Sequence, residues 1–93
     1  KPVEAFAREA TAFNRRLVEG KRVILKFDIE RYDKYGRLLA YIYLADGTFV
    51  NAELIKQGYA QIMTFPPNVK HAELFLKLQR EAREANRGLW GKQ

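Results

Sequence analysis

The sequence predicts an α+β domain with a small antiparallel sheet and helices packed on it. An apolar stripe with helical spacing comes first, an alternating strand pattern follows it, and a second amphipathic stretch lies near the C-terminus. The charged turn Asp33–Gly36 separates two strand-like runs and so predicts an antiparallel pair. A chain of 93 residues forms one domain at most, and that domain is marginally stable, because so small a chain buries only about 60–65% of its unfolded surface. We therefore expect residues 1–93 to belong to a single domain.

The first predicted helix runs from Glu4 to Glu19. Its apolar residues recur at spacings of four, three and four, and they form a stripe of Phe6, Ala10, Phe13 and Leu17. Gly20 is a natural C-terminal cap, because glycine adopts the left-handed backbone conformation that often ends helices.

Two strands are predicted after this helix. Residues 22–31 alternate between apolar and polar side chains, so the apolar set is expected to face the core: Val23, Leu25, Phe27 and Ile29. A second strand is expected at Leu38–Leu44, and Asp46-Gly47 predicts a tight turn to a short strand at Thr48–Val50. These strands cannot close a barrel, so an open edge is expected. This leaves three alternatives. Another segment covers the open edge, a homo-oligomer or strand exchange pairs it with a second copy, or the sheet stays small and open.

Two more helices are predicted in the second half of the chain. Asn51 is expected to cap a short helix at Ala52–Gln57, which ends at Gly58. Asn68, after a rigid Pro-Pro loop, is expected to cap the last helix at Val69–Asn86. Beyond Gly88, the Leu-Trp pair is expected to fold back onto the core.

The composition favours an anionic partner. The net charge is +6 and the isoelectric point is about 9.8, which indicates nucleic acid first and an acidic membrane surface second. The absence of cysteine excludes disulfides and thiolate metal sites, and a single histidine excludes a His-rich zinc site. No apolar run approaches the ~20 residues of a membrane span, so no membrane partner is expected. No signal peptide is visible, but the first residue is Lys1 rather than methionine, so the location stays open.

The most specific motif is a basic turn followed by an aromatic strand. The motifs are, in order, Asp33-Lys34-Tyr35-Gly36-Arg37, Leu39-Ala40-Tyr41-Ile42-Tyr43, Asp46-Gly47, Val50-Asn51, Gln57-Gly58, Pro67-Asn68, His71 and Gly88-Leu89-Trp90. This order resembles the staphylococcal nuclease-like (thermonuclease) family over essentially the whole chain, which matches roughly the C-terminal two-thirds of a family domain. The resemblance implies a partial OB-fold-like β-barrel with helices packed on it and without its N-terminal strands. It also implies calcium-dependent hydrolysis of phosphodiester bonds in DNA or RNA by the complete parent domain.

The resemblance implies a catalytic role for Arg37 and phosphate contacts for Lys34 and Tyr35. Phosphodiester hydrolysis builds negative charge on the phosphoryl oxygens, and a planar guanidinium that stays protonated can donate two parallel hydrogen bonds to them. Lysine adds a point charge and the tyrosine hydroxyl adds a directed hydrogen bond. Phe65 stands where the family has tyrosines that pack on a base, so the resemblance implies either base stacking by Phe65 or ordinary packing of its ring in the core or loop. His71 is the only imidazole, and a surface or capping role is expected for it.

The same resemblance places the calcium ligands and the water-activating carboxylate in N-terminal strands that have no counterpart in this chain. We therefore assign no metal ligand and no general base to any residue present. We expect the chain alone to bind single-stranded DNA or RNA weakly and to cleave little or none. The alternative is a non-catalytic nucleic-acid-binding or protein-interaction module on the same scaffold. Family members are often exported, which makes secretion or the cell envelope the location that the resemblance implies.

Overall fold

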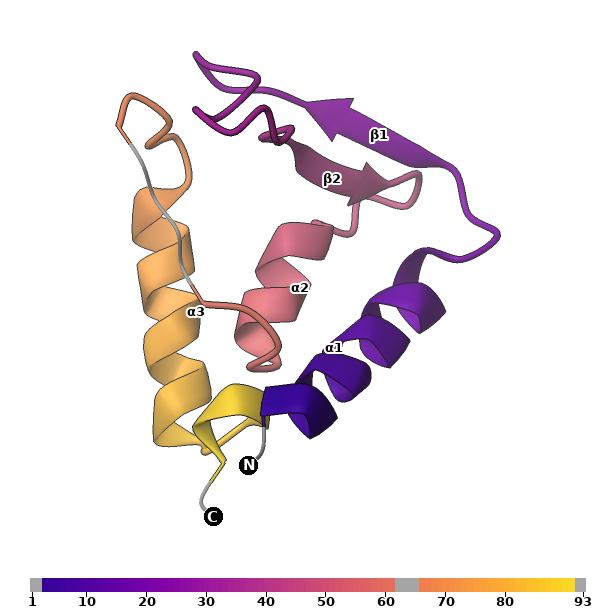
Figure 1. Ribbon diagram of the computed structural model, residues 1–93, viewed down its shortest axis with the longest axis vertical. Coiled ribbons are helices and arrows are strands. Elements are labelled where there is room, and N and C mark those ends of the chain that lie inside the picture. The colour runs from indigo at the N-terminus through magenta and orange to yellow at the C-terminus, as the bar shows by residue number, and fades with distance from the viewer. Residues whose placement is uncertain (1–2, 62–65, 92–93) are drawn as a thin grey trace.

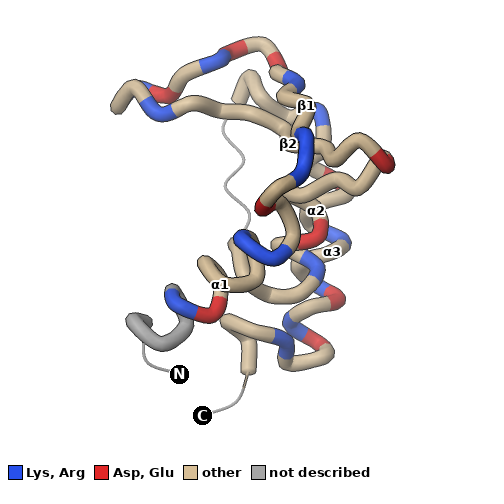
Figure 2. The backbone as a smooth tube through the Cα atoms, turned by 90° about the vertical axis from the view of Figure 1, so that its right-hand side faces the viewer, with Lys and Arg blue, Asp and Glu red and all other residues tan. Residues whose placement is uncertain are grey.

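The computed structural model describes residues 3–61 and 66–91, with side chains from residue 8 onward. It confirms the α+β class. The elements in chain order are α1 (Val3–Val18), β1 (Val23–Lys26), β2 (Tyr41–Leu44), α2 (Val50–Lys56), α3 (Ala72–Glu84) and the 3-10 turn η1 (Gly88–Trp90). The two strands form one layer, and α2 lies beneath them between α1 and α3 (Figure 1). In side view, the loop between the strands projects from the sheet (Figure 2).

The sheet is a two-stranded antiparallel ribbon. Val23 pairs with Leu44 at one end and Lys26 pairs with Tyr41 at the other. Both strands are shorter than predicted, because the chain leaves extended pairing after Lys26. The side-chain amide of Asn68 satisfies the backbone of Glu30 instead: its Oδ1 accepts from the Glu30 N–H at 2.9 Å and its Nδ2 donates to the Glu30 carbonyl at 2.8 Å.

The apolar set predicted to line the core from residues 22–31 is largely exposed in the described part of the chain, so that prediction is wrong for most of the set. Val23 and Leu25 on β1 are 43% and 44% exposed, and Ile29 beyond β1 is 73% exposed, whereas Phe27 is half-buried. The reason is that β1 pairs with β2 along one edge only, and no second layer among the described residues covers it. The buried core lies instead under β2, around Leu44, Val50, Ile55 and Ala82.

The apolar stripe of α1 faces the interior where its side chains are described. The Phe13 ring stacks on Tyr59, with ring centroids 4.7 Å apart and an angle of 28° between the rings. This contact joins α1 to the segment that follows α2. Stacked aromatic pairs at this separation stabilise beyond their buried area by about 0.5–1.5 kcal/mol.

Asn51 is not a helix cap. It lies within the first turn of α2, and Phe49 occupies the cap position without a side-chain hydrogen bond. The Asn51 amide reaches the strand instead: Oδ1 accepts from the Ile42 N–H at 2.8 Å and Nδ2 donates to the Ala40 carbonyl at 3.1 Å. A side-chain amide has the same donor and acceptor as a peptide group, so it substitutes for a neighbouring strand. The short third strand is reduced to a single bridge between Tyr43 and Phe49.

Asn68 is not a helix cap either. The last helix begins at Ala72, and His71 occupies its cap position without a capping hydrogen bond from its side chain. The chain closes after α3 where the Leu89 N–H donates to the Gly58 carbonyl at 2.7 Å. Gly58 has a φ of +79°, and a Cβ atom there would collide with the Arg87 carbonyl, so this close approach requires glycine.

Candidate phosphate-binding site

The site is built on the hairpin that connects β1 to β2. Tyr32 and Leu38 form an isolated antiparallel bridge, and the Leu39 N–H donates to the Arg31 carbonyl at 2.7 Å. At the tip, the Gly36 N–H donates to the Asp33 carbonyl at 3.1 Å. Gly36 has a φ of +80°, which only glycine adopts at little cost, so the turn is set by its own sequence.

Asp33 organises the tip through both of its carboxylate oxygens. Oδ1 accepts hydrogen bonds from the backbone amides of Tyr35 and Arg37, each at 2.9 Å. Oδ2 accepts from the Arg37 side chain, with 2.6 Å between Nε and Oδ2. Partial burial acts to raise the pKa of Asp33, but these hydrogen bonds and the charge of Arg37 outweigh it and lower the pKa. Asp33 is therefore a carboxylate at neutral pH.

The three predicted contacts Lys34, Tyr35 and Arg37 come together at the hairpin tip. The Arg37 guanidinium carbon lies 5.4 Å from the centre of the Tyr35 ring, and the Lys34 Nζ lies 5.1 Å from it. The Arg37 side chain is 66% exposed, and Tyr35 is 72% exposed. Asp33 binds Arg37 through Nε. The two terminal nitrogens of Arg37 have no hydrogen-bond partner among the described residues, so they are available to donate hydrogen bonds to a ligand.

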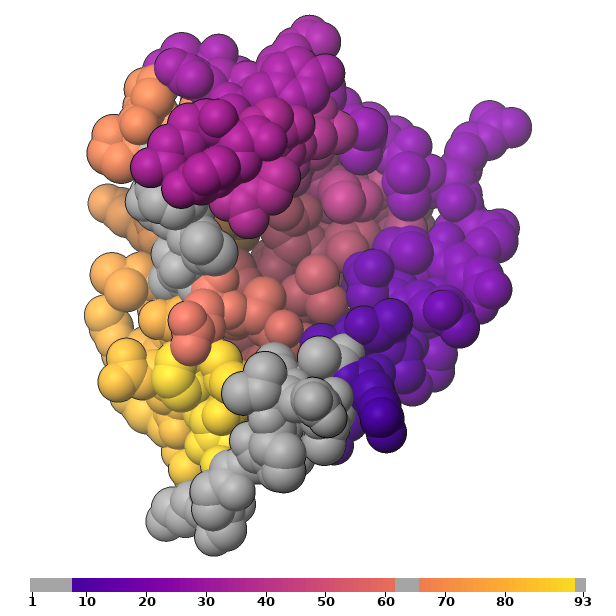
Figure 3. All heavy atoms as spheres, in the orientation of Figure 1, coloured from indigo at the N-terminus to yellow at the C-terminus, as the bar shows by residue number. Residues whose placement is uncertain are grey.

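A groove of about 460 Å³ runs beside these side chains. The hairpin forms one wall, with Tyr35 and Arg37, and Pro67 and Asn68 contribute to the other. The Asn68 amide holds the two walls together through its hydrogen bonds to Glu30. In Figure 3 the hairpin is the magenta lobe at the upper front, with the loop near residue 70 in orange beside it. Phe65, the predicted stacking residue, lies outside the described residues.

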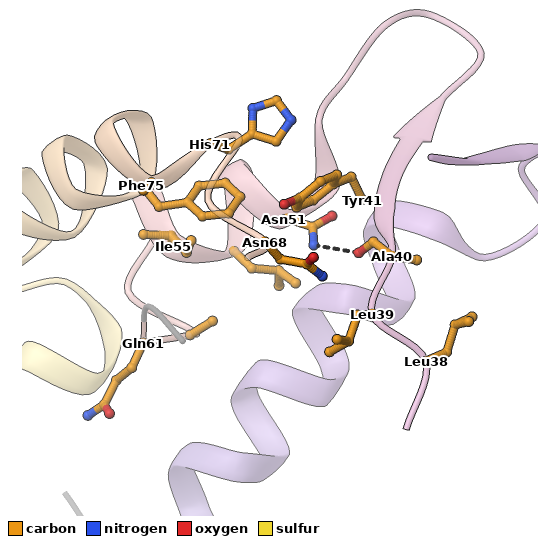
Figure 4. Close-up of a pocket in the computed structure, with 13 residues that line it drawn as sticks. Leu38, Leu39, Ala40, Tyr41, Asn51, Ile55, Gln61, Asn68, His71 and Phe75 are labelled. Atoms are coloured by element: carbon orange, nitrogen blue, oxygen red, sulfur yellow. Dashed lines mark hydrogen bonds between the residues drawn. The ribbon is translucent and has the colours of Figure 1, made fainter. Parts of the chain in front are cut away.

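A second pocket of about 300 Å³ lies between α2, α3 and the start of β2 (Figure 4). Figure 4 labels Asn51 with its hydrogen bond to Ala40, together with Tyr41, His71 and Phe75. The imidazole of His71 lies 4.5 Å from the Tyr41 ring and 5.8 Å from the Phe75 ring, between centroids. This pocket adjoins the Arg37 groove, because Leu39 and Asn68 line both.

Asp28 and Tyr41 connect the strand to the start of α3. The Tyr41 hydroxyl donates to Asp28 Oδ2 at 3.0 Å, and the Lys70 N–H donates to the same oxygen at 3.0 Å. Burial, with the nearby Asp28 charge, raises the pKa of Tyr41 to about 12. The hydrogen bond from Lys70 lowers the pKa of Asp28, so the cluster is a structural anchor in its charged form.

His71 has a structural role. Its Nε2 is buried and has no hydrogen-bond partner in the described part of the chain, and its side chain does not cap α3. Burial lowers the pKa of His71, and the Lys70 charge adds to the same effect. The expected capping role is therefore replaced by aromatic packing.

Sequence reasoning missed the residues that hold the site in shape. The motif gives Asp33 no role of its own, and local sequence predicts Asn51 and Asn68 as helix caps. The sequence does indicate this role for Asp33, because an Asp that begins a tight turn commonly accepts a hydrogen bond from the backbone amide two residues later. The signal for the two asparagines was absent, since their partners lie 11 and 38 residues away.

The described residues offer no donor set for calcium. Calcium takes six to eight oxygen ligands, several of them from carboxylates. No group of three or more acidic, His or Cys side chains comes close enough to hold a metal ion among the residues that the structure describes. The described residues therefore do not fit a calcium site.

No helix in the described ranges has the length and apolar character that crossing a bilayer requires. The single-domain boundary and the site roles of Lys34, Tyr35 and Arg37 stay predictions. What the geometry adds is that these three side chains share one exposed surface.

Comparison with known proteins places these features in one family. A model described as staphylococcal nuclease homologue matches residues 1–92. The thermonuclease of Staphylococcus intermedius is 38% identical over 89 residues, which cover 96% of this chain and 52% of that protein. Two Bacillus subtilis proteins are also similar. The SPbeta prophage-derived endonuclease YokF is 38% identical over 97% of this chain and 31% of its own length, and the endonuclease YncB is 37% identical over 97% and 43%. The chain thus spans about half, or less, of the length of these relatives, and it belongs to the staphylococcal nuclease homologue family.

Proposed function

We propose that the parent domain hydrolyses phosphodiester bonds in DNA or RNA and that this chain supplies part of its phosphate-binding site. The observation that carries the proposal is the state of Arg37. Asp33 fixes the Arg37 guanidinium through Nε, and the Arg37 side chain is 66% exposed at the hairpin tip. The thermonuclease and endonuclease names of the relatives support a nuclease-type activity.

Arg37 acts in this proposal on the charge that develops during hydrolysis. Water attacks the phosphorus, the bond from phosphorus to the leaving oxygen breaks, and that oxygen takes up a proton to become a hydroxyl. Negative charge grows on the non-bridging oxygens, where the two Nη groups of Arg37 donate hydrogen bonds. Lys34 supplies a second positive charge, and the Tyr35 hydroxyl donates to a terminal phosphate of the bound strand.

Calcium dependence is the family expectation, and the residues described here do not fit a calcium site. We propose that its ligands and the water-activating base belong to parts of the parent domain outside this chain. The proposal therefore predicts that the 93-residue chain binds single-stranded DNA or RNA weakly and cleaves it little or not at all.

The test is hydrolysis of heat-denatured DNA by the parent domain and by the 93-residue chain, each with calcium and with chelator. Arg37→Ala in the parent is expected to lower kcat by about 10²–10³-fold, the cost of removing one donor to a developing oxyanion. Arg31→Ala is the matched control, because it removes the same charge from the base of the same hairpin, where the guanidinium packs on Phe27. Equal losses from both variants would overturn the role of Arg37.

A non-catalytic nucleic-acid-binding module is the second candidate. It is favoured by the net charge of +6 together with the lack of a metal-binding group in the described ranges. The two candidates separate in the parent protein. Calcium-dependent cleavage that requires Arg37 supports the nuclease, whereas salt-dependent binding without cleavage supports the binding module.

A further inference from the structure

Most of the excess positive charge lies away from the Arg37 hairpin. Residues 8–26 hold six basic and two acidic residues, a net +4 of the total of +6. Residues 27–61, which include the hairpin, hold four basic and five acidic residues. All six basic side chains of the first segment are exposed: Arg8, Arg15, Arg16, Lys21, Arg22 and Lys26. A phosphate site at Arg37 does not account for this charge.

Within this basic segment, Arg8 and Arg15 both lie on α1. Seven residues are almost two helical turns, so the two side chains leave the helix in nearly the same direction, about 10 Å apart along its axis. Thr11 and Ala12 lie between them, and the four residues line a shallow hollow of about 320 Å³. Phe13 faces the interior and stacks on Tyr59, which places the hollow on the outward side of the helix.

The hollow presents hydrogen-bond donors. Among the residues whose side chains the structure describes, its lining contains two guanidinium groups and one hydroxyl, and no acidic residue. No ion pair involves Arg8 or Arg15 in the part of the chain that the structure describes, although Glu19 follows Arg15 by one helical turn. The two guanidinium groups can each donate charge-assisted hydrogen bonds to an anion.

We propose that the outward face of α1, formed by Arg8, Thr11, Ala12 and Arg15, binds the sugar-phosphate backbone of a nucleic acid at a distance from the hairpin. The proposal rests on the proposed function and extends its substrate contact. A spacing of two helical turns suits successive phosphates of a polymer better than one small anion. A membrane is disfavoured, because Thr11 and Ala12 provide no large apolar side chain for insertion into lipid.

The arrangement of the molecule permits one strand to reach both surfaces. In Figure 1, the hairpin between β1 and β2 lies at the upper left and α1 at the lower right of a molecule that measures 38 Å along its longest axis. A single strand long enough to cross the molecule can contact both. The contact at α1 is electrostatic and independent of base sequence, so it adds affinity and salt dependence without specificity.

The test measures binding of a fluorescent 20-nucleotide single strand to the 93-residue chain by anisotropy over a salt series, with chelator present. Arg8→Gln/Arg15→Gln is expected to reduce the slope of log K against log salt by about 1.4, the value for two lost phosphate contacts on a single strand. Lys77→Gln/Arg80→Gln on α3 is the matched control, with the same change in charge on exposed helical positions. It is expected to change the slope much less. Glutamine keeps a good helix propensity, and circular dichroism checks that α1 is retained.

Three outcomes overturn the proposal: equal slope changes in both double variants, no slope change in the α1 variant, or no binding by the unmodified chain at low salt. A fourth is loss of retention on phosphatidylserine vesicles with unchanged oligonucleotide binding, which assigns the face to a membrane. Failure of the proposed function is recognised separately, because it is read from cleavage by the parent domain and its Arg37 dependence.

Discussion

Asp33 and Arg37 form a charge-assisted hydrogen bond at the hairpin tip, with 2.6 Å between Oδ2 and Nε. The same carboxylate accepts from the Arg37 and Tyr35 amides, so a single residue sets both the turn and the direction of the guanidinium. The side chain of Asp33 is 14% exposed, against 66% for Arg37. The anion is thus shielded within the turn, whereas the cation is presented to solvent.

Asp33→Asn is expected to leave the hairpin folded and to lower the activity of the parent domain by up to about 10²-fold. Asparagine keeps an acceptor for the two backbone amides but loses the charge that fixes Nε, and misplaced catalytic groups cost rates of this order. The measurement is kcat and KM on single-stranded DNA. If Asp33 acts by positioning Arg37, Asp33→Asn has no further effect when Arg37 is already alanine.

Asp46→Asn is the matched control for that prediction. Asp46 also accepts a backbone hydrogen bond inside a turn, from the Thr48 N–H at 2.9 Å, but it does not contact Arg37. A similar loss of activity in Asp46→Asn would show that the Asp33 effect is general destabilisation of the ribbon.

Asn51→Ala is expected to destabilise the chain by about 1–3 kcal/mol. The substitution leaves the part-buried Ile42 N–H and Ala40 carbonyl without their partner, and an unsatisfied backbone group costs more than a hydrogen bond contributes. The free energy of unfolding is measured by urea titration. Asn68→Ala is expected to cost less, because its two bonds to Glu30 are exposed and water replaces them.

These two asparagines also show what local sequence can and cannot predict. The helices, the turn at Gly36 and the order of the elements follow from spacings within a few residues, and they are found where expected to within a few positions. An asparagine before a helical run fits a cap equally well on local grounds. The partners of Asn51 and Asn68 depend on which backbone groups the folded chain leaves unpaired, at Ala40 and Glu30 respectively. The residues next to each asparagine in the sequence do not contain that information.

The exposure of β1 has a similar cause. Alternation at residues 22–31 indicates a strand with an apolar side, but it does not say whether a covering layer is present. The motif that groups Lys34, Tyr35 and Arg37 was readable because all three lie in one turn. The structure brings Asn68 to the same groove from a segment about thirty residues away.

Stability is expected to fall as the pH drops below about 6.5, the ordinary pKa of histidine. The fold lowers the pKa of His71, so between its folded pKa and 6.5 the unfolded chain binds more protons than the folded chain. The contribution of neutral His71 is therefore complete above pH 6.5 and is lost as the pH falls from there through the folded pKa. The charges that face it are Lys70, which adds to the shift, and Asp28, which opposes it.

His71→Phe is expected to remove this pH dependence, because phenylalanine keeps the ring packing against Tyr41 and does not titrate. The free energy of unfolding is measured from pH 8 to pH 5 for both proteins. His71 is the only histidine, and the lowered pKa of Asp28 places its effect at more acidic pH, so the assignment is direct. Parallel curves for the two proteins would show that another group titrates.

The outer edge of β1 has no strand partner among the described residues. Val23, Ile24 and Leu25 are 43–49% exposed, and the strand pairs on one side only within the described ranges. An exposed apolar strand edge pairs readily with another chain. We therefore expect the 93-residue chain to self-associate as its concentration rises. Ile24→Lys/Leu25→Lys is expected to abolish that association, since charged side chains on an edge strand block pairing.

Sedimentation velocity over a wide concentration range measures this association. Leu74→Lys/Leu76→Lys is the matched control, because it adds the same two charges at apolar positions of α3 that are 39% and 53% exposed. If association occurs through β1, the control still self-associates and the β1 variant does not. A chain that stays monomeric at every concentration contradicts the prediction, and equal dissociation of both variants shows that net charge, rather than the strand edge, controls association.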